Sequence, residues 1–123
     1  MGEKFSEKSC IPCEGGIAPL PLERIYQFLE QVSGWSLEEK DSPGAGGPGR
    51  VPQITKEYEF DDFNEALSFV NKVAEIAEQE GHHPNIFMHD YRKVKLTLYT
   101  HAIKGLHEND FILAAKIDEI QME

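Results

Sequence analysis

Apolar residues recur at helical spacing near both ends of the chain. Between positions 21 and 32 they return every three or four residues, and Pro21 suits the first turn of a helix. Near the C-terminus, Asn109 or Asp110 can cap a second helix, whose apolar side is formed by Phe111, Leu113, Ala114, Ile117 and Ile120. The pattern therefore predicts one helix over 21–32 and a final helix that reaches Ile120.

The longest helical pattern lies in the middle of the chain. Asp61 or Asp62 can cap it, and Gly81 can end it because glycine tolerates the left-handed conformation. Its apolar residues cover roughly half of the helix circumference, at Phe63, Ala66, Leu67, Phe69, Val70, Val73, Ala74, Ile76 and Ala77. A small domain has little material to cover so wide a face. We therefore expect a homo-oligomer, a dimer or a tetramer, formed through the 61–81 helix.

Period-two alternation between these helices predicts four strands. Trp35 and Leu37 belong to a short strand, and 54–60 alternates over a second. After a break at Pro84, the stretches 86–89 and 93–100 form a hairpin. Hairpins flanked by helices indicate an α+β fold of order α-β-β-α-β-β-α, with a four-stranded antiparallel sheet and helices on one face.

Length and turn residues define the domain organisation. At 123 residues the chain has the size of one domain. Residues 1–19 contain prolines and glycines without sustained periodicity, so we expect an extended N-terminal arm followed by a single domain over 20–123. The glycine-rich stretch 41–50 is expected to be a hairpin tip.

Charge and cysteine content narrow the classes of function. Twenty-two acidic against twelve basic residues give a formal charge of -10, which disfavours direct nucleic-acid binding. No apolar run approaches the roughly 20 residues of a membrane helix, so we expect a cytoplasmic protein without a membrane partner. Cys10 and Cys13 form a lone C-x-x-C, which we interpret as reduced thiols in preference to a zinc or redox site.

Histidines are the main candidates for chemistry. His82 and His83 lie on a constrained corner between Gly81 and Pro84, and period two places His101 on the same strand face as Tyr99. If the hairpin packs beside the corner, the three imidazoles share one cleft and can give and take protons near neutral pH. On composition alone, solvated turn histidines are favoured over catalysis, and the spacing does not support a metal site.

Four further residues could assist or simply serve the fold. Glu78 lies one helical turn before His82 and can orient a histidine or bind a ligand, although a solvated helix edge explains it slightly better. Asp110 can bind a ligand, but helix capping also accounts for it. Tyr91 is more typical of packing, and His89 and His107 are interpreted as surface residues.

The signatures of serine hydrolases, P-loop proteins and dinucleotide-binding folds are missing from the sequence. The remaining class of chemistry is acid-base catalysis, for which we expect no cofactor and no metal.

The histidine segment resembles a known family. Glu78-Gln-Glu-Gly-His82-His83-Pro84, then Tyr91, His101, Gly105-Leu106 and Asp110, is similar to the signature of the pterin-4a-carbinolamine dehydratases. Gly81 and Ile86 depart from the residues that many members have. The resemblance implies an α-β-β-α-β-β-α fold, an oligomer, and a hydro-lyase that dehydrates 4a-hydroxytetrahydropterin to quinonoid dihydropterin in tetrahydrobiopterin recycling.

The same resemblance implies site roles. It makes His82, His83 and His101 catalytic, with His82 or His101 as the acid at the hydroxyl and His83 as a positioning or base group. Its substrate-binding or supporting residues are Glu78, Pro84, Tyr91 and Asp110. A rival interpretation is a non-catalytic pterin- or protein-binding module, because some animal relatives also stabilise a transcription-factor dimer.

Overall fold

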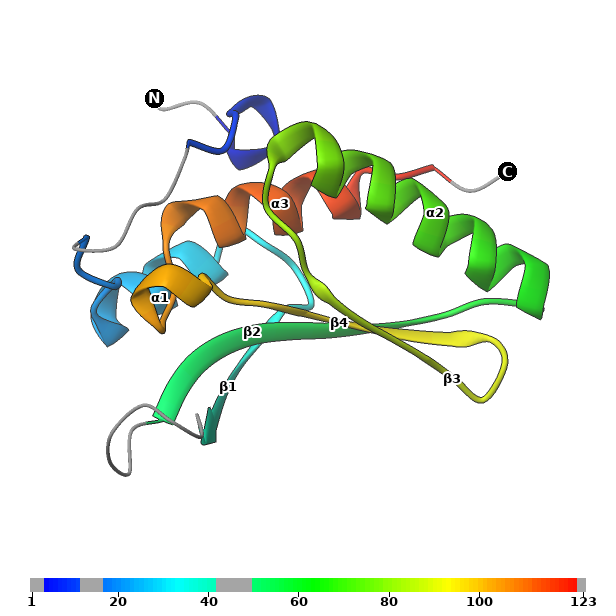
Figure 1. Cartoon of the computed structure of the whole chain (residues 1–123), viewed down its shortest axis with the longest axis horizontal. Coiled ribbons are helices and arrows are strands. Elements are labelled where there is room, and N and C mark those ends of the chain that lie inside the picture. The colour runs from blue at the N-terminus through cyan, green and yellow to red at the C-terminus, as the bar shows by residue number, and fades with distance from the viewer. Residues whose placement is uncertain (1–3, 12–16, 42–49, 122–123) are drawn as a thin grey trace.

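A computed structural model describes residues 4–11, 17–41 and 50–121 (Figure 1). Positions 42–49 of the expected hairpin tip and Cys13 lie outside this part of the chain. The described elements are, in chain order, η1 (Phe5–Glu7), α1 (Leu22–Leu29), β1 (Ser36–Asp41), β2 (Arg50–Glu59), α2 (Phe63–Glu80), β3 (Asn85–His89), β4 (Lys93–Leu98), η2 (His101–Ile103) and α3 (Glu108–Asp118). The predicted α+β class and order of helices and strands are confirmed.

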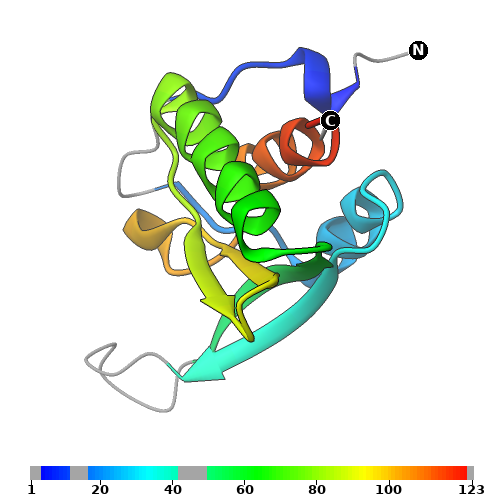
Figure 2. The same ribbon diagram turned by 90° about the vertical axis from the view of Figure 1, so that its right-hand side faces the viewer.

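The four strands form one antiparallel sheet in the order β1-β2-β4-β3. Val94, Leu96 and Leu98 of the central strand β4 are fully buried and point toward the helices, as their alternation predicts. Figures 1 and 2 show the helices on one face of the sheet. None of the helices in the described residues is long and apolar enough to cross a membrane.

The last helix, α3, lies at the centre of the core. Phe111, Leu113 and Ala114 are completely buried, because α2 covers one side of α3 and the N-terminal η1 covers another. Phe5 of η1 packs edge-on against Phe28 at a ring-centroid distance of 5.0 Å, and it also contacts Phe111. Part of the N-terminal arm therefore contributes to the hydrophobic core.

Most element boundaries differ from the sequence-based prediction by a few residues. The first helix is shorter than 21–32, and β2 begins at Arg50. The prediction that Asn109 or Asp110 caps the last helix is wrong, because His107 is the cap and both residues lie in the first turn. His107 Nδ1 accepts from the Asn109 backbone N–H at 3.0 Å, and Asp110 Oδ2 accepts from the His107 N–H at 3.0 Å.

The N-cap of α2 provides a test of the fold. Asp62 accepts a hydrogen bond from the backbone N–H of Glu65 at 2.8 Å. Asp62→Ala is expected to lower the free energy of unfolding by about 1 kcal/mol because that N–H loses its acceptor. Asp61→Ala removes the same charge one position earlier and is the control. Urea unfolding that gave equal losses for the two variants would contradict this assignment.

Candidate active site

The two adjacent histidines lie where α2 ends. Gly81 adopts the left-handed conformation at φ 64°, which ends the helix, and the backbone N–H of His82 donates to Ala77 O at 3.2 Å. Pro84 then directs the chain into β3 at Asn85. Because both sides of the corner are restricted, the backbone of the histidine pair is held in one path, as the sequence predicted.

His82 is held by a buried carboxylate. Its Nε2 lies 2.6 Å from Asp110 Oδ1, and the side chain of Asp110 is completely buried. The other oxygen of Asp110 accepts from the Thr100 hydroxyl at 2.9 Å and from the His107 backbone N–H. An ionised carboxylate only accepts hydrogen bonds, so Nε2 of His82 donates to Asp110 and Nδ1 is left for a ligand. Asp110 thus sets the orientation and tautomer of His82.

His83 has a carboxylate partner of a different kind. Its Nε2 lies 2.7 Å from Glu78 Oε1, but the side chains are 60% and 78% exposed. An exposed pair of this kind is weakly held because water competes for both partners. His83 is therefore freer to reorient around a ligand than His82.

His101 enters the site from the end of the sheet. It begins η2 directly after Thr100, whose backbone forms a bridge with Gly105, and its ring packs on Tyr99 at a centroid distance of 4.2 Å. The contact confirms that Tyr99 and His101 share a face. Gly105 is required here, because a Cβ at this position would lie 2.7 Å from Pro19 Cβ.

The three predicted histidines meet at one cleft of about 240 Å³. Its lining consists of Ile11, Gly81, His82, His83, Tyr99, Thr100, His101, Ala102 and Asn109. Figure 1 shows why: the corner after α2, the end of β4 and the start of α3 lie at the same end of the sheet. Several imidazoles around one small cavity can donate and accept protons at different atoms of a bound ligand.

The other predicted site residues have different positions. Asp110 lies behind His82 and Glu78 beside His83, while Pro84 forms the exit from the corner. Tyr91 lies in the β3–β4 turn at the opposite end of the hairpin, roughly 20 Å away along β4. The structure does not bring Tyr91 into this cleft.

The interpretation of His89 and His107 as surface residues was incomplete. Both are half-buried and hydrogen-bonded. His89 contacts Glu57 and Asp90 near the β3–β4 turn, whereas His107 caps α3. Neither residue lines the cleft.

Cys10 lies at the edge of the site and is poorly suited to nucleophilic chemistry. Burial, followed by the nearby carboxylate of Glu80, raises the pKa of its thiol to about 12. The thiol therefore stays protonated near neutral pH, whereas the thiolate is the reactive form. Within the described residues, no group of three or more His, Cys, Asp or Glu side chains is arranged to hold a metal ion.

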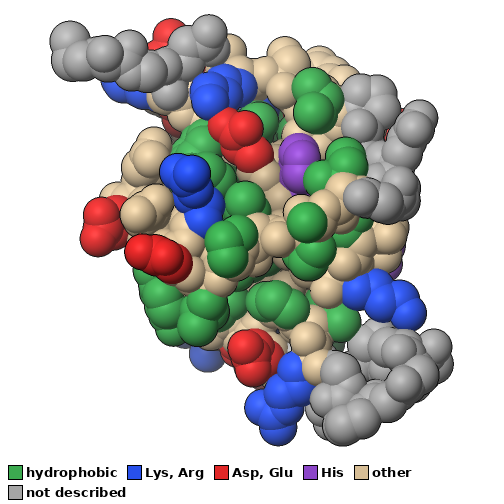
Figure 3. All heavy atoms as spheres, turned by 90° about the vertical axis from the view of Figure 1, so that its left-hand side faces the viewer, with side chains coloured by type: hydrophobic (Ala, Val, Ile, Leu, Met, Phe, Trp, Pro, Cys, Tyr) green, Lys and Arg blue, Asp and Glu red, His purple; other side chains and the backbone are tan. Residues whose placement is uncertain are grey.

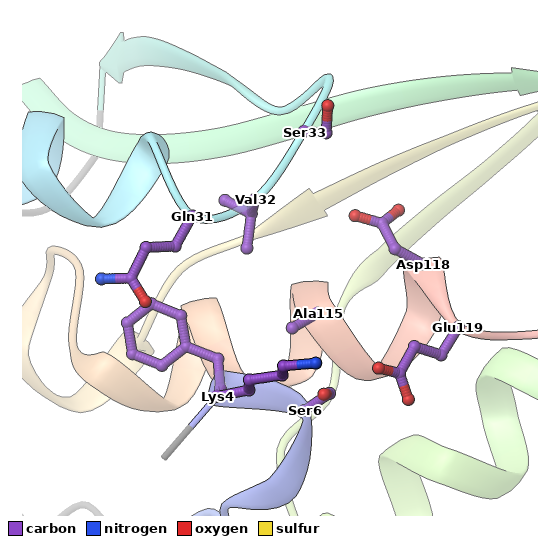
Figure 4. Close-up of a pocket in the computed structure, with 9 residues that line it drawn as sticks. Lys4, Ser6, Gln31, Val32, Ser33, Ala115, Asp118 and Glu119 are labelled. Carbon is purple, nitrogen blue, oxygen red and sulfur yellow. The ribbon is translucent and has the colours of Figure 1, made fainter. Parts of the chain in front are cut away.

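A second cavity of about 300 Å³ lies between η1, the segment after α1 and the end of α3 (Figure 4). It includes Asp118, but this carboxylate already accepts hydrogen bonds from Trp35, Lys56 and Tyr58. Burial and the hydrogen bond to Asp118 raise the pKa of Tyr58, so its hydroxyl stays protonated. No histidine lines this cavity in the described part of the chain, and the carboxylate of Asp118 serves the fold.

Sequence reasoning missed Ile11, Thr100 and Asn109 as parts of the site. Thr100 and Asn109 adjoin predicted site residues in the sequence, so closer attention to those neighbours could have found them. Ile11 has no such signal, because it lies some 70 residues before the histidine pair and belongs to a segment without periodicity.

Fold and cleft together define a small α+β protein with three histidines around one cleft, and known proteins are similar to this chain. A family model, pterin 4 alpha carbinolamine dehydratase, matches residues 18–120. A Halorhodospira halophila protein named "Putative pterin-4-alpha-carbinolamine dehydratase" is 44% identical over 116 residues, covering 94% of this chain and 96% of the relative. A Methylococcus capsulatus protein of the same name is 40% identical over 119 residues, or 97% and 95% of the two chains.

A solved structure is also similar. The crystal structure of a transcriptional coactivator/pterin dehydratase from Brucella melitensis matches with a TM-score of 0.65 and 30% identity, over 81% of this chain and 95% of that one. The protein described here belongs to the pterin 4 alpha carbinolamine dehydratase family.

The two histidine–carboxylate pairs at the cleft, His82–Asp110 and His83–Glu78, should differ in their contribution to stability. Asp110→Ala leaves Thr100, His107 N–H and His82 without an acceptor, so we expect the free energy of unfolding to fall by about 3 kcal/mol. Glu78→Ala breaks an exposed pair and should change it by less than about 0.5 kcal/mol. Urea unfolding measures both, and similar losses in the two variants would contradict the assignment.

Proposed function

We propose that this protein dehydrates 4a-hydroxytetrahydropterin to quinonoid dihydropterin and water, without a cofactor, as part of tetrahydrobiopterin recycling in the cytoplasm. Membership of the dehydratase family supports the class of reaction. The observation that carries the proposal is the convergence of His82, His83 and His101 on one cleft.

The reaction breaks the bond between C4a and the hydroxyl oxygen. A proton added to that oxygen allows it to leave as water, and loss of the proton on N5 forms the new double bond between N5 and C4a. The substrate therefore loses one water molecule with no change in oxidation state. General acid and base groups typically accelerate such steps by about 10²–10⁴ each.

The proposed roles are those that the resemblance to the dehydratase family implies. The acid at the hydroxyl is His82 or His101, and His83 positions the substrate or accepts the N5 proton. Asp110 is a positioning residue, because its oxygens are bonded to His82, Thr100 and His107. Glu78 and Pro84 flank His83 and are proposed to support pterin binding from the rim.

Histidine substitutions test the activity. Conversion of freshly generated 4a-hydroxytetrahydropterin is followed by the absorbance of quinonoid dihydropterin. His82→Ala, His83→Ala and His101→Ala are each expected to lower kcat/KM by roughly 10²-fold or more, whereas His89→Ala is expected to have little effect because it lies outside the cleft.

A folded wild-type protein that does not accelerate this step would refute the proposed activity. Circular dichroism of each variant separates loss of chemistry from loss of structure. If His89→Ala lost as much activity as the three cleft variants, the cleft would not be the site.

A second candidate function is a non-catalytic pterin- or protein-binding module on the same fold. The Brucella melitensis relative is described as a coactivator as well as a dehydratase. In this chain, α2 presents Phe63 and Leu67 at 50% and 40% exposure, which is apolar surface available to a partner. Tight binding of a pterin by wild type without any dehydration would favour this alternative.

The same surface supports our proposal of a homo-oligomer through α2. Ala66, Phe69, Val73 and Ala77 are buried in the core, which leaves a second stripe of Phe63, Leu67 and Ala74 exposed at helical spacing. The sheet and α3 together cover only one side of the wide apolar face that the sequence predicted for α2. A second copy of this chain would cover the other.

Leu67→Glu tests the oligomer. A charge in a closely packed apolar contact is costly, so sedimentation equilibrium should show a shift of the variant toward the monomer mass. Ser68→Glu places the same charge on a neighbouring exposed position of α2, off the stripe, and is expected to keep the wild-type mass. A wild-type protein of monomer mass, or equal effects of both substitutions, would contradict this surface.

A further inference from the structure

The N-terminal segment Lys8–Ile11 is fastened along the edge of the histidine cleft. The side-chain amide of Asn109 is buried and makes two hydrogen bonds with the backbone of Ile11: its Oδ1 accepts from Ile11 N at 3.1 Å, and its Nδ2 donates to Ile11 O at 2.7 Å. Both polar backbone groups of Ile11 are thereby satisfied by one side chain. The two hydrogen bonds therefore fix the position of the backbone from which the Ile11 side chain extends.

Neighbouring contacts hold the same segment. Cys10 N donates to Glu80 Oε1 at 2.7 Å, and Lys8 pairs with Glu108 at 2.6 Å. Figures 1 and 2 show the segment passing the C-terminal end of α2 on its way from η1. The segment is therefore attached to α3 and to the last residue of α2, directly before the histidine corner.

The side chain of Ile11 remains 59% exposed although its backbone is fully hydrogen-bonded. It lines the cleft together with His82, His83 and His101. Figure 3 shows the face of the molecule to which α1 and η2 belong, with hydrophobic side chains at many places on it. The cleft thus combines proton-carrying groups with an apolar wall contributed by the N-terminal segment.

We propose that Ile11 is a substrate-contacting residue that packs against the non-polar face of the bound bicyclic ring, and that Asn109 is the positioning residue that holds it there. The inference rests on the proposed function for the identity of the ring. A pterin has polar edges, which imidazoles can recognise, and flat apolar faces, which need a non-polar surface to leave water. Ile11 supplies such a surface in a cleft whose other side chains are largely polar.

Removing the apolar side chain of Ile11 should weaken substrate binding and leave the chemistry intact. For Ile11→Ala, the expected result is a rise of roughly tenfold in KM for 4a-hydroxytetrahydropterin, because apolar area is no longer covered on binding. The value of kcat should stay within about twofold, since the histidines are unchanged. Ile17→Ala is the matched control: it removes the same side chain from an exposed position outside the cleft.

A direct binding measurement separates this inference from the proposed reaction. Fully oxidised pterin cannot be dehydrated, and its fluorescence allows titration with wild type, Ile11→Ala and Ile17→Ala. A roughly tenfold higher Kd for Ile11→Ala alone supports the wall even if wild type shows no dehydratase activity. If wild type dehydrates its substrate and Ile11→Ala leaves both KM and Kd unchanged or lower, the wall inference is overturned while the function stands. If the wild-type protein neither binds oxidised pterin nor dehydrates the substrate, the proposed function and the inference about Ile11 are both contradicted.

The positioning role of Asn109 is tested by measuring whether the segment Lys8–Ile11 stays docked without it. In a Cys13→Ser background, iodoacetamide labelling of Cys10 should be slow in the docked segment, because burial raises the pKa of this thiol to about 12. Asn109→Ala should speed labelling and raise KM like Ile11→Ala, and the double variant should add little to either single one because both act on one contact. Additive effects on KM, or unchanged labelling, would show that Asn109 does not act through Ile11.

Discussion

A completely buried carboxylate, Asp110, connects the parts of this protein that form the cleft. Its two oxygens bind His82 at the end of α2, Thr100 at the end of β4 and the backbone of His107 at the start of α3. A buried carboxylate is stable only when such partners surround it, so these segments cannot separate without exposing its charge to an apolar interior. The constraint that stabilises the fold at this point therefore also sets the geometry of the histidine cleft.

Helix α3 carries a second carboxylate, Asp118, which joins several segments at the other end of the helix. Asp118 accepts from Trp35, Lys56 and Tyr58, which come from the segment before β1 and from β2. The helix is thus bonded to the sheet and loops at both ends while Phe111, Leu113 and Ala114 are buried between them. A centrally placed helix of this kind can hold cleft residues in position, which is what pre-organised acid-base chemistry requires.

The cleft contrasts a mostly buried histidine with an exposed one. His82 is mostly buried and bonded to Asp110, whereas His83 and its partner Glu78 are exposed to water. A fixed group can deliver a proton along one direction, and a group at the rim can adjust as the ligand enters or leaves. Asn109, next to Asp110 in the same helical turn, binds the N-terminal segment instead and lines the cleft with Ile11.

The sequence by itself determined the order of helices and strands, because helical and strand periodicities are local properties of the chain. It also located the histidine corner, since Gly81 and Pro84 restrict the backbone on either side. Only the tertiary structure decided that His101 joins His82, that Tyr91 lies elsewhere, and that Asp110 is a buried partner of His82 as well as part of the capping box of α3. These relations, like the position of Ile11, depend on packing between segments distant in sequence, and local periodicity carries no information about which distant segments meet.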